Sequence, residues 1–312
     1  MNLVVVIIPA YRANATLPRT VASVKAQTMS VEIVVVDDGS PEPVPPMDGV
    51  RIIRQANAGG YAARLRGVAE TTAPYVVFVD ADDVIEPTLC EKMMKLAEAE
   101  RLDVVQCETW RSDAEPPGGV EILAGREEIL RRYVRPVLVD GQGAATAWGK
   151  LYRRETCFGE SFEPSTLMMY DDFAINLQAF RRVTRMGFLR EGLYHYAVNS
   201  GSSVAQFKRS YIDDFEEAIR FRRKFLPEYG VAEGDPCFAA WIALNLRTHM
   251  RRASYAPCGS WRERLANVRE LYRRIAGKVP ALLAARVCAV ILGVKVRCRC
   301  RMVGVFLCRC RG

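Results

Sequence analysis

The sequence predicts an α/β protein in which a mostly parallel β-sheet is flanked by helices and followed by a helical, basic C-terminal extension. Two observations favour this class. Apolar, β-branched runs alternate with amphipathic stretches through the first 110 residues, and this alternation is typical of parallel sheets covered on both faces by helices. Half of the 312 residues are hydrophobic, so the chain has ample material for a core.

The predicted elements of the first part follow one another in regular order. Residues 3–8 are a continuous β-branched run, as expected of a strand buried on both faces. Residues 16–27 have apolar residues at helical spacing, and Thr16 is a plausible N-cap. Further strands are expected at 31–38, 50–55, 74–83 and 102–110, and further helices at 62–70 and 87–100.

The second part has a less regular pattern. Residues 112–121 are rich in Pro and Gly and indicate a loop or boundary. The remaining patterns predict a helix at 125–134, a strand and turn at 147–155, a helix at 170–183, an extended segment at 185–198, and amphipathic helices between 207 and 276.

Acidic residues follow two of the predicted buried strands. Asp37 and Asp38 end one strand, and Asp80, Asp82 and Asp83 end another. Because ligands of parallel sheets bind beyond the carboxyl ends of the strands, we expect these acids to share one site. Crowded carboxylates are costly unless a cation balances them, and Mg²⁺ or Mn²⁺ prefers such ligands. A metal whose open positions take phosphate oxygens fits a nucleoside diphosphate, although any single Asp after a strand can instead cap a helix.

The opening of the chain carries a specific resemblance. Residues 4–42, VVVIIPAYRANATLPRTVASVKAQTMSVEIVVVDDGSPE, and residues 55–83, which end in VFVDADD, resemble the inverting glycosyltransferases of family 2, which have the GT-A fold. The likeness resumes at WGKLYRRE, YDDFAINL and YHYAVNSGSS, so it extends to about residue 203. Each motif alone is weak, but the ordered set is specific.

The resemblance implies a site for a nucleotide-activated sugar, with a UDP-sugar as the common donor among relatives. Pro9 and Tyr11 would line the pocket of the base, and Asp38 would hydrogen-bond the base. Arg64 would lie near the base and the diphosphate, and Asp80 would lie near the ribose. These roles are carried over from the family pattern.

The same pattern implies the metal ligands and the catalytic base. Asp82, with Asp83, would hold Mn²⁺ or Mg²⁺. Asp172 matches the aspartate of the Glu-Asp pair that acts as general base, so it would take the proton of the attacking hydroxyl. The acceptor would be a hydroxyl of a glycan or lipid-linked glycan, as in cell-envelope polysaccharide synthesis.

Trp148 and Lys150 resemble the W-x-K element on the side of the sugar and acceptor. Two positions depart from the family pattern. Leu65 stands where the family usually has Asn, and Asp171 stands where it has Glu, so Asp171 and Asp172 compete for the acceptor-facing role. Position favours Asp172 as the base and leaves Asp171 beside the acceptor.

Each assignment has a structural alternative. Tyr11 could pack against the sheet edge, Arg64 could be a solvated helix arginine, and Trp148 could belong to the core. One acid of the 171–172 pair could cap the helix that follows. His195 is one of two histidines, and we expect it to be structural rather than catalytic or metal-binding.

The resemblance implies a glycosyltransferase domain over residues 1–205, with a nucleotide-sugar-binding half at 1–110 and an acceptor half at 111–205. A helical region at 206–278 and a Cys/Arg-rich tail at 279–312 follow. Six Lys and Arg residues and no acid occupy residues 295–312, so this tail supplies most of the +8 net charge. The rest of the chain is nearly balanced, which argues against nucleic-acid binding.

Basic clusters that alternate with apolar stretches predict contact between the tail and an anionic membrane surface. A solvated tail and a zinc site at its two Cys-Arg-Cys motifs are the alternatives. No signal sequence or membrane span is evident, so we expect a cytoplasmic protein, peripheral on the inner membrane.

Two other functions compete with glycosyl transfer. A nucleotidyltransferase would normally have a glycine-rich basic loop after the first strand, whereas residues 9–17 contain no glycine. A non-catalytic nucleotide-sugar-binding or scaffold relative would lack the metal acids or the base, and both are present. The sequence does not identify the donor sugar or the acceptor.

Overall fold

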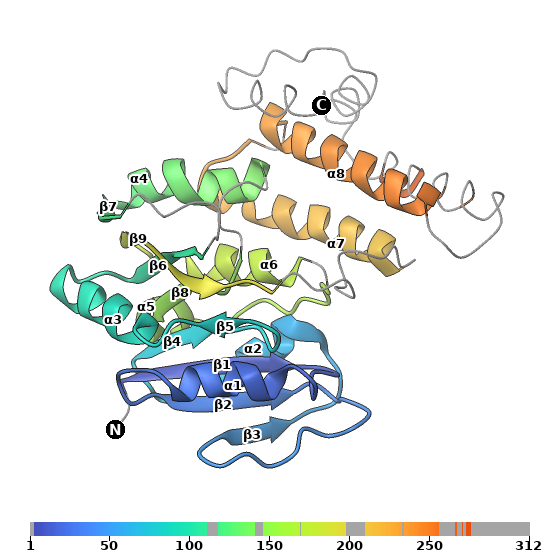
Figure 1. The fold of residues 1–312 in the computed structure, drawn as a ribbon. Coiled ribbons are helices and arrows are strands. Elements are labelled where there is room, and N and C mark those ends of the chain that lie inside the picture. The colour runs from blue at the N-terminus through green and yellow to red at the C-terminus, as the bar shows by residue number, and fades with distance from the viewer. Residues whose placement is uncertain are drawn as a thin grey trace. The chain divides into compact units, whose positions relative to one another are not determined.

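The computed structural model of the chain describes residues 3–110, 118–140, 146–168, 170–197, 210–232 and 234–255, together with 266, 270 and 273–275. Its centre is one sheet with the strand order β3-β2-β1-β4-β8-β6-β9-β5, and β7 pairs with β9 beside this path (Figure 1). The predicted α/β class is confirmed: the protein has a central sheet with helices on both faces.

The first half of the sheet is parallel. Its four strands are β1 (Val4–Ala10), β2 (Glu32–Asp37), β3 (Arg51–Arg54) and β4 (Tyr75–Phe78). Strand β1 pairs in parallel with β2 and β4, and β2 pairs in parallel with β3. Valine and isoleucine predominate in β1, β2 and β4 because nearly every position of these strands is buried, so both faces favour branched apolar side chains, whereas the edge strand β3 is partly exposed.

Helices cover both faces of this parallel part. The even-numbered residues of β1 pack in one apolar cluster with α1 (Leu17–Lys25) and α3 (Leu89–Ala99). On the other face, Ile7 lies so close to Gly67 of α2 (Gly59–Ala69) that an added Cβ would come within 2.4 Å of the Ile7 side chain. The sheet is therefore the middle layer of three.

The second half of the sheet has mixed directions. It contains β8 (Lys150–Arg153), β6 (Val104–Thr109), β9 (Arg185–His195), β5 (Val84–Ile85) and β7 (Val120–Ala124). Strand β8 is antiparallel to β4 and β6, whereas β9 is parallel to β6 and antiparallel to β5 and β7. The short helices α4 (Arg126–Ile129) and α5 (Arg154–Phe158) and the longer α6 (Asp171–Ala179) accompany these strands.

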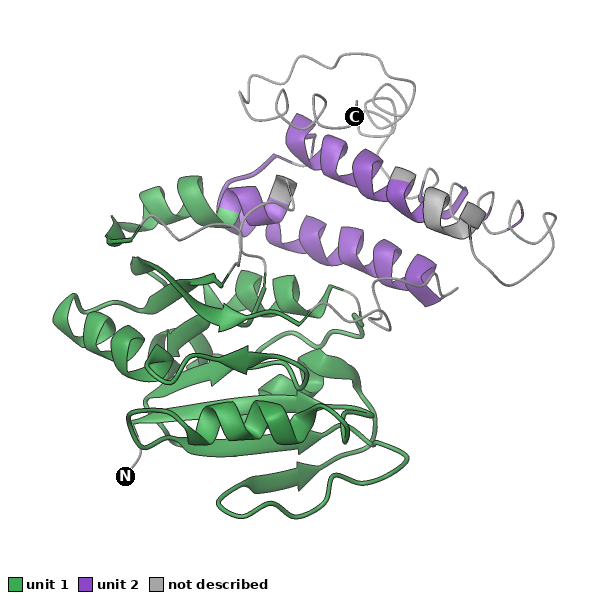
Figure 2. Ribbon diagram, in the orientation of Figure 1, with its two compact units in different colours: residues 1–134, 144–200 green, residues 135–143, 201–312 purple. Residues whose placement is uncertain are grey.

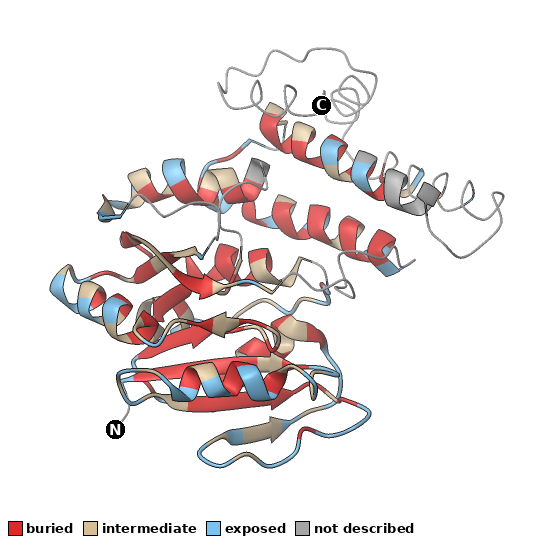
Figure 3. Cartoon of the chain, in the orientation of Figure 1, coloured by how far each residue is buried: buried red, intermediate tan, exposed pale blue. Residues whose placement is uncertain are grey.

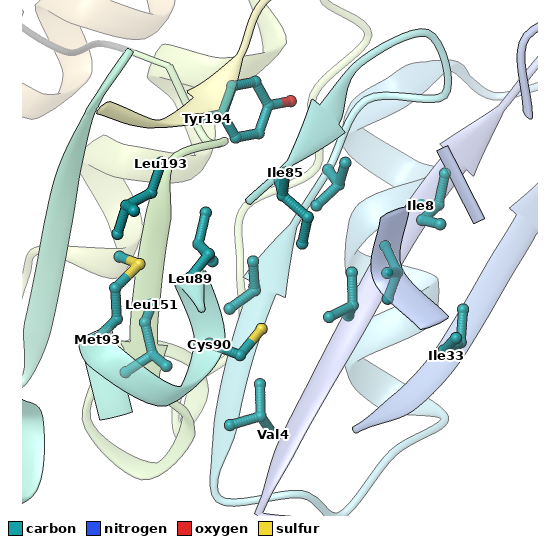
Figure 4. Packing of buried hydrophobic residues seen from close by; sticks show 14 of the residues in the cluster. Val4, Ile8, Ile33, Ile85, Leu89, Cys90, Met93, Leu151, Leu193 and Tyr194 are labelled. Carbon is teal, nitrogen blue, oxygen red and sulfur yellow. The ribbon is translucent and has the colours of Figure 1, made fainter. Parts of the chain in front are cut away.

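The apolar core runs through both halves of the sheet. Figure 4 shows residues from β1, β5, β8, β9 and α3, including Ile8, Leu89 and Leu151, packed in one layer. Tyr194 of β9 lies at the end of this layer with its hydroxyl pointing out of the apolar cluster. The colours of Figure 3 show the same continuity, since the buried residues follow the strands and the inner faces of their helices.

Several elements differ from the sequence-based predictions, among them α5, which was not predicted. The strand predicted at 74–83 ends at Phe78, because the chain turns at 81–82 before the two-residue strand β5. Helix α2 begins at Gly59 rather than at residue 62. Strand β7 was not predicted; it is a half-exposed edge strand of five residues, so its side chains carry no clear alternation of apolar and polar types.

The chain divides into two compact units, residues 1–134 with 144–200 and residues 135–143 with 201–312 (Figure 2). The second unit contains α7 (Ser210–Phe225), the single turn η3 (Pro227–Tyr229), α8 (Pro236–Tyr255) and the π-helical segment η2 (Pro136–Asp140). A second π-helical segment, η1 (Leu130–Val134), ends the first stretch of unit one. The predicted boundary near residue 205 and the tail at 279–312 lie outside the described residues, as does most of the predicted helix at 261–278.

Inside the second unit, a buried arginine joins the segments. The Arg222 guanidinium lies 4.0 Å from the centre of the Trp241 ring, and it donates hydrogen bonds to the carbonyl oxygens of Val137 and Leu138. The two carbonyl oxygens and the Trp241 ring therefore help to stabilise the buried guanidinium. Within the described part of the chain, no helix combines the length and the hydrophobicity that crossing a membrane requires.

Candidate active site at the carboxyl ends of the strands

The parallel strands bring their acidic ends together. Ala10 at the end of β1 is paired with Asp37 at the end of β2, and the Asp38 N–H donates a 2.8 Å hydrogen bond to the Ala10 carbonyl. Phe78 of β4 is paired with Ile7, so the segment at 79–83 emerges beside the end of β1. The ends of β1, β2 and β4 therefore lie along one edge, and the acids that follow β2 and β4 share it, as predicted.

Asp37, the first acid of the site, is held by backbone N–H donors and by an arginine. Asp37 accepts hydrogen bonds from the Ser40 N–H and Val44 N–H, and it pairs with Arg54 at 2.6 Å. Burial raises the pKa of Asp37, but the hydrogen bonds from Ser40 and Val44 and the charge of Arg54 outweigh that effect and leave the pKa below its ordinary value. Asp37 therefore holds the loop after β2 in its folded form.

Asp38, the predicted contact of the base, joins that loop to α2. Its carboxylate accepts hydrogen bonds from the backbone N–H of Ala58 at 2.9 Å and of Gly59 at 2.8 Å, and from the Gln55 amide at 2.8 Å. Because the first N–H groups of a helix have no partner within the helix, this carboxylate caps α2 from a distance in sequence. The predicted contact with a nucleotide base stays a prediction.

The loop after β1 presents an exposed aromatic ring. The Tyr11 side chain is half exposed, and the Arg12 guanidinium lies 5.3 Å from the centre of its ring. Arg12 has φ of 54°, a left-handed conformation that only a few non-glycine residues adopt, and its N–H is fixed by the Ser40 hydroxyl at 3.0 Å. Pro9 lies within β1 opposite Val36. The alternative that Tyr11 packs against the sheet edge does not match its exposure.

The Asp80 to Asp83 segment forms a turn, in which the Asp83 N–H donates to the Asp80 carbonyl at 3.0 Å. Asp83 is fully buried, and its carboxylate accepts hydrogen bonds from the Tyr194 hydroxyl at 2.6 Å and the Ala197 N–H at 2.8 Å. Burial raises the pKa of Asp83 to about 7. Asp82 is partly exposed, and its carbonyl accepts a hydrogen bond from Arg19 at 3.0 Å.

Arg64 connects this turn to the predicted base. Its guanidinium lies 2.6 Å from Asp80, 2.6 Å from Asp171 and 3.3 Å from Asp172, and only 5% of the side chain is exposed. The alternative of a solvated helix arginine is therefore wrong. The structure brings together residues that stand more than a hundred positions apart in the sequence.

Asp171 and Asp172 occupy the first turn of α6, where negative charge is favoured by the helix dipole. Neither caps the helix, because the N-cap residue is Tyr170. Burial raises the pKa of Asp172 to about 7, with Arg64 opposing the shift. The Asp172 Oδ1 atom is buried without a hydrogen-bond partner. An unsatisfied buried carboxylate oxygen with a pKa near neutrality has the properties of a proton acceptor.

Lys150 lies buried beside Asp172 and contacts the segment that precedes Trp148. Its ammonium is completely buried and donates to the Thr146 carbonyl, which also accepts a 2.9 Å hydrogen bond from the Asn176 amide. Burial lowers the pKa of Lys150 to about 7, while the negative charge of Asp172 opposes the shift. The predicted contact of Lys150 with a sugar stays a prediction, and the observed contacts fix the segment that carries Trp148.

Trp148 is stacked with two tyrosines. Its ring lies 4.5 Å from the Tyr194 ring and 5.6 Å from the Tyr196 ring, with interplanar angles of 15° and 20°. Tyr196 is half exposed. Partial burial is the largest cause that raises its pKa, and the negative charges of Asp83, Asp82, Asp80 and Asp172 raise it further. This aromatic group therefore borders the acidic site.

Tyr194 and Tyr196 belong to the site although neither was predicted as a site residue. The Tyr194 hydroxyl accepts a hydrogen bond from the Asp80 N–H and donates one to the Asp83 carboxylate, so it fixes the acidic turn. Their signal was the alternation of Tyr-His-Tyr at the end of a predicted extended segment. His195 points to other partners: its Nε2 lies 2.5 Å from Glu86 and its ring stacks on Trp110 at 5.0 Å, in keeping with a structural role.

The carboxylates of the site suit a hard divalent cation whose remaining ligands would come from the substrate. No cluster of three or more His, Cys, Asp and Glu side chains arranged for a metal occurs in the described ranges. Mg²⁺ and Mn²⁺ are commonly held by one or two carboxylates plus substrate phosphates, so a preformed cage is not required. The site does carry surplus negative charge, since the buried Arg64 faces three carboxylates.

Comparisons with known proteins identify the family. The model of "Glycosyl transferase family 2" matches residues 5–174, more than half of the chain. The uncharacterized glycosyltransferase EpsJ of Bacillus subtilis (strain 168) is 28% identical over 253 residues, which are 74% of this chain and 71% of EpsJ. The cholesterol galactosyltransferase of Borreliella burgdorferi is 24% identical over 223 residues, 63% of this chain and 60% of that protein.

Solved structures share the fold at low identity. TarS residues 1–349 of S. aureus, in complex with UDP-GlcNAc, has a TM-score of 0.63 and 16% identity, covering 94% of this chain and 89% of that chain. The mannosyltransferase PcManGT of Pyrobaculum calidifontis, in complex with GDP-Man and Mn²⁺, has a TM-score of 0.51 and 15% identity, covering 94% and 88%. The family match and the shared fold lead to one conclusion: this chain belongs to glycosyl transferase family 2 and is a glycosyltransferase with the GT-A fold.

Proposed function

We propose that the enzyme transfers a sugar from a nucleoside diphosphate donor, a UDP-sugar in the first instance, to a hydroxyl of a glycan or lipid-linked glycan, with inversion at the anomeric carbon. The observation that carries the proposal is Asp172, whose buried Oδ1 lacks a hydrogen bond and lies beside the guanidinium that also holds Asp80. The Arg64 guanidinium thus links the proposed proton acceptor, Asp172, to Asp80 in the proposed donor half of the site.

The donor would lie along the edge formed by the ends of β1, β2 and β4. Pro9 and Tyr11 would line the base pocket, because the exposed Tyr11 ring can stack on a planar base. Asp38 would reach the base in addition to capping α2, and Asp80 would contact the ribose. Arg64 belongs to the donor half because it holds Asp80 at 2.6 Å.

Mn²⁺ or Mg²⁺ would be held by Asp82, with Asp83 as the second ligand expected from the sequence. The hydrogen bonds that Asp83 receives from Tyr194 and Ala197 favour Asp82 as the principal ligand. When bound, the metal would supply positive charge to the leaving diphosphate. TarS and PcManGT, which share the fold, have been solved with UDP-GlcNAc and with GDP-Man and Mn²⁺ respectively, and these ligands support the class of donor and cofactor.

The reaction would be a single displacement. The acceptor hydroxyl gives its proton to Asp172 as its oxygen forms a bond to the anomeric carbon. The bond from that carbon to the diphosphate oxygen breaks on the opposite face, and its electron pair leaves with the nucleoside diphosphate. One displacement inverts the configuration. Trp148 and Asp171 border the acceptor side, and Lys150 fixes the Trp148 segment through Thr146.

A donor-hydrolysis screen tests the proposal. UDP-N-acetylglucosamine, UDP-glucose, UDP-galactose and GDP-mannose are incubated with the protein and Mn²⁺ or Mg²⁺, and release of the nucleoside diphosphate is measured. We expect release from at least one donor, dependent on the metal, and its loss in Asp172→Asn when a sugar acceptor is supplied. Neither binding nor hydrolysis of any donor would contradict the proposal.

We further propose that the tail at 279–312 docks the enzyme on an anionic membrane, which places it on the cytoplasmic face of the inner membrane. The support is the sequence alone, six basic residues interleaved with apolar ones in 295–312. Flotation with phosphatidylglycerol liposomes compares the full chain with a chain ending at Gly277 and with a full-length variant whose six basic tail residues are glutamine. Equal flotation of all three would exclude this docking.

A further inference from the structure

The Arg64 side chain is the one described cation that contacts acids from both halves of the site. Its Nη2 lies 2.6 Å from Asp80 Oδ1, in the donor half, and 3.3 Å from Asp172 Oδ1, in the acceptor half. Its Nη1 lies 2.6 Å from Asp171 Oδ2. One planar group thus spans the turn after β4 and the first turn of α6.

The acids at this point outnumber the cations, even when the buried ammonium of Lys150, which also acts to lower the pKa of Asp172, is counted with Arg64. One guanidinium faces three carboxylates, and only 5% of the Arg64 side chain is exposed, so solvent screens the group little. Burial raises the pKa of both Asp171 and Asp172, and the nearby charge of Arg64 counteracts that rise. The protonation state of Asp172 therefore depends on how closely the Arg64 guanidinium interacts with it.

Nη2 is divided unequally between its two carboxylates. The 2.6 Å contact with Asp80 is a short, charge-assisted hydrogen bond, whereas the 3.3 Å approach to Asp172 leaves Oδ1 without a hydrogen bond. A group that engaged Asp80 would weaken the first contact. Nη2 would then be available to Asp172 without any movement of the backbone.

From this arrangement we infer that Arg64 is a positioning residue that couples the donor to the base: when the donor engages Asp80, Nη2 passes from Asp80 to Asp172 and holds Asp172 in its proton-accepting position. The inference rests on the proposed function, because it assumes that Asp80 contacts the donor and that Asp172 accepts the proton. It adds a reason for the base to become competent only when a donor is bound.

The surrounding structure keeps Arg64 in place for this task. A Cβ on Gly60 would lie 2.5 Å from Asp171 Oδ2 and 2.9 Å from Arg64 Nη1, so the start of α2 packs directly against the ion pair. The substitution Arg64→Lys keeps the positive charge but replaces the planar guanidinium, with its separated nitrogens, by a single ammonium. Such an ammonium cannot contact Asp80, Asp171 and Asp172 at the same time.

The kinetic test compares Arg64→Lys with Arg66→Lys, a matched control on the same helix whose side chain is half exposed and paired with Glu70. We expect Arg64→Lys to lower the kcat of transfer about 100-fold while the KM for the donor changes less than about threefold. Gly60→Ala, which removes no charge, should also lower kcat. Arg66→Lys should leave both constants unchanged.

A spectroscopic test reads the coupling without turnover. The carboxyl carbon of Asp172 is followed by ¹³C NMR across pH, with Asp172→Asn to assign its signal and with UDP or GDP plus Mg²⁺ as the probe. We expect the bound nucleotide to lower the titration midpoint of Asp172 in the unmodified enzyme but not in Arg64→Lys. The pH dependence matters because a structural role alone would not make the midpoint depend on the nucleotide.

Each adverse result has a distinct meaning. If Arg64→Lys raises the donor KM and leaves kcat intact, Arg64 serves the donor alone and the inference is wrong. The same conclusion follows if both proteins show equal midpoint shifts, or if the unmodified enzyme binds nucleotide without any shift. If neither UDP nor GDP binds and no donor is turned over, the proposed function fails and the inference fails with it.

Discussion

The acids at the end of β2 and those at the start of α6 have opposite surroundings. Asp37 and Asp38, at the end of β2, are surrounded by N–H donors that the fold itself supplies. Asp171 and Asp172, at the start of α6, share one guanidinium with Asp80, and one oxygen of Asp172 has no hydrogen bond. The first pair stabilises the loops, whereas the second pair retains unsatisfied capacity for chemistry.

This difference separates two kinds of motif acid that look alike in the sequence. An Asp that is fully hydrogen-bonded contributes to the free energy of folding, because removing it leaves buried donors unpaired. An Asp that is buried and incompletely paired reduces stability and is retained for function. By its hydrogen bonds Asp83 resembles the first kind, but burial raises its pKa to about 7, so its ionised form is destabilised as that of Asp172 is.

The largest effect is expected at Asp172. Asp172→Asn should lower the kcat of transfer by about 10²–10⁴-fold, the usual contribution of a general base, and should leave nucleotide binding measured by calorimetry unchanged. Because ionised Asp172 is destabilised by burial, its raised pKa costs stability as pH rises from the ordinary aspartate range through about 7. The variant should therefore unfold at the same or a higher temperature than the unmodified enzyme at pH 8. Full transfer activity would remove Asp172 from the mechanism.

The next effect separates Asp82 from Asp83. Asp82→Asn should weaken metal-dependent donor turnover by roughly 100-fold, because one of very few carboxylates for the cation is lost. Chelation of the metal should abolish turnover of the unmodified enzyme, and added Mn²⁺ should restore it. Asp83→Asn should instead cost about 1–3 kcal/mol of stability through its lost hydrogen bonds. A reversal of these two outcomes would make Asp83 the metal ligand.

Asp38 gives the corresponding test in the donor half. Asp38→Ala removes the acceptor of the Ala58 and Gly59 N–H groups, and we expect a loss of about 2–4 kcal/mol in the free energy of unfolding. Urea unfolding at pH 7 measures it. Glu42→Ala, at an exposed residue of the same loop, is the control and should change stability by less than about 0.5 kcal/mol. An unaltered stability in Asp38→Ala would make Asp38 a donor contact alone.

The smallest effect is the dependence of kcat on pH. Asp172 must be ionised to accept a proton, and burial raises its pKa to about 7. Below that value kcat should fall about tenfold per pH unit, and above it kcat should level off. Initial rates between pH 5 and 9 at saturating donor and metal measure this limb, with nucleotide binding followed at each pH. A flat profile down to pH 5 would show that the base is an ordinary carboxylate.

The sequence predicted the parallel half of the fold well because its signals are local. The β-branched runs of β1, β2 and β4 and the apolar spacing of α1 follow from burial on both faces, and the site edge follows from strand direction. The second half was harder, because β7 and the mixed pairing of β9 depend on long-range register rather than on composition.

The candidate site shows the same limit. The family resemblance pointed to Arg64 and Asp172, but their ion pair joins residues more than a hundred positions apart, and no local pattern encodes that distance. Likewise, the sequence alone does not reveal that Asp83 faces Tyr194 whereas Asp82 remains partly exposed. Which acid is satisfied depends on the tertiary structure.

The register of β9 has a consequence for insertions and deletions. In its pairing with β5, Tyr194 lies opposite Ile85 and His195 lies opposite Val84, so adjacent residues serve opposite faces of the sheet. A one-residue slip would exchange them. The imidazole would then replace the phenol that holds Asp80 and Asp83, and Tyr194 would leave Trp148. A single codon gained or lost within this strand could thus silence the enzyme while every acidic residue of the site remained in the sequence.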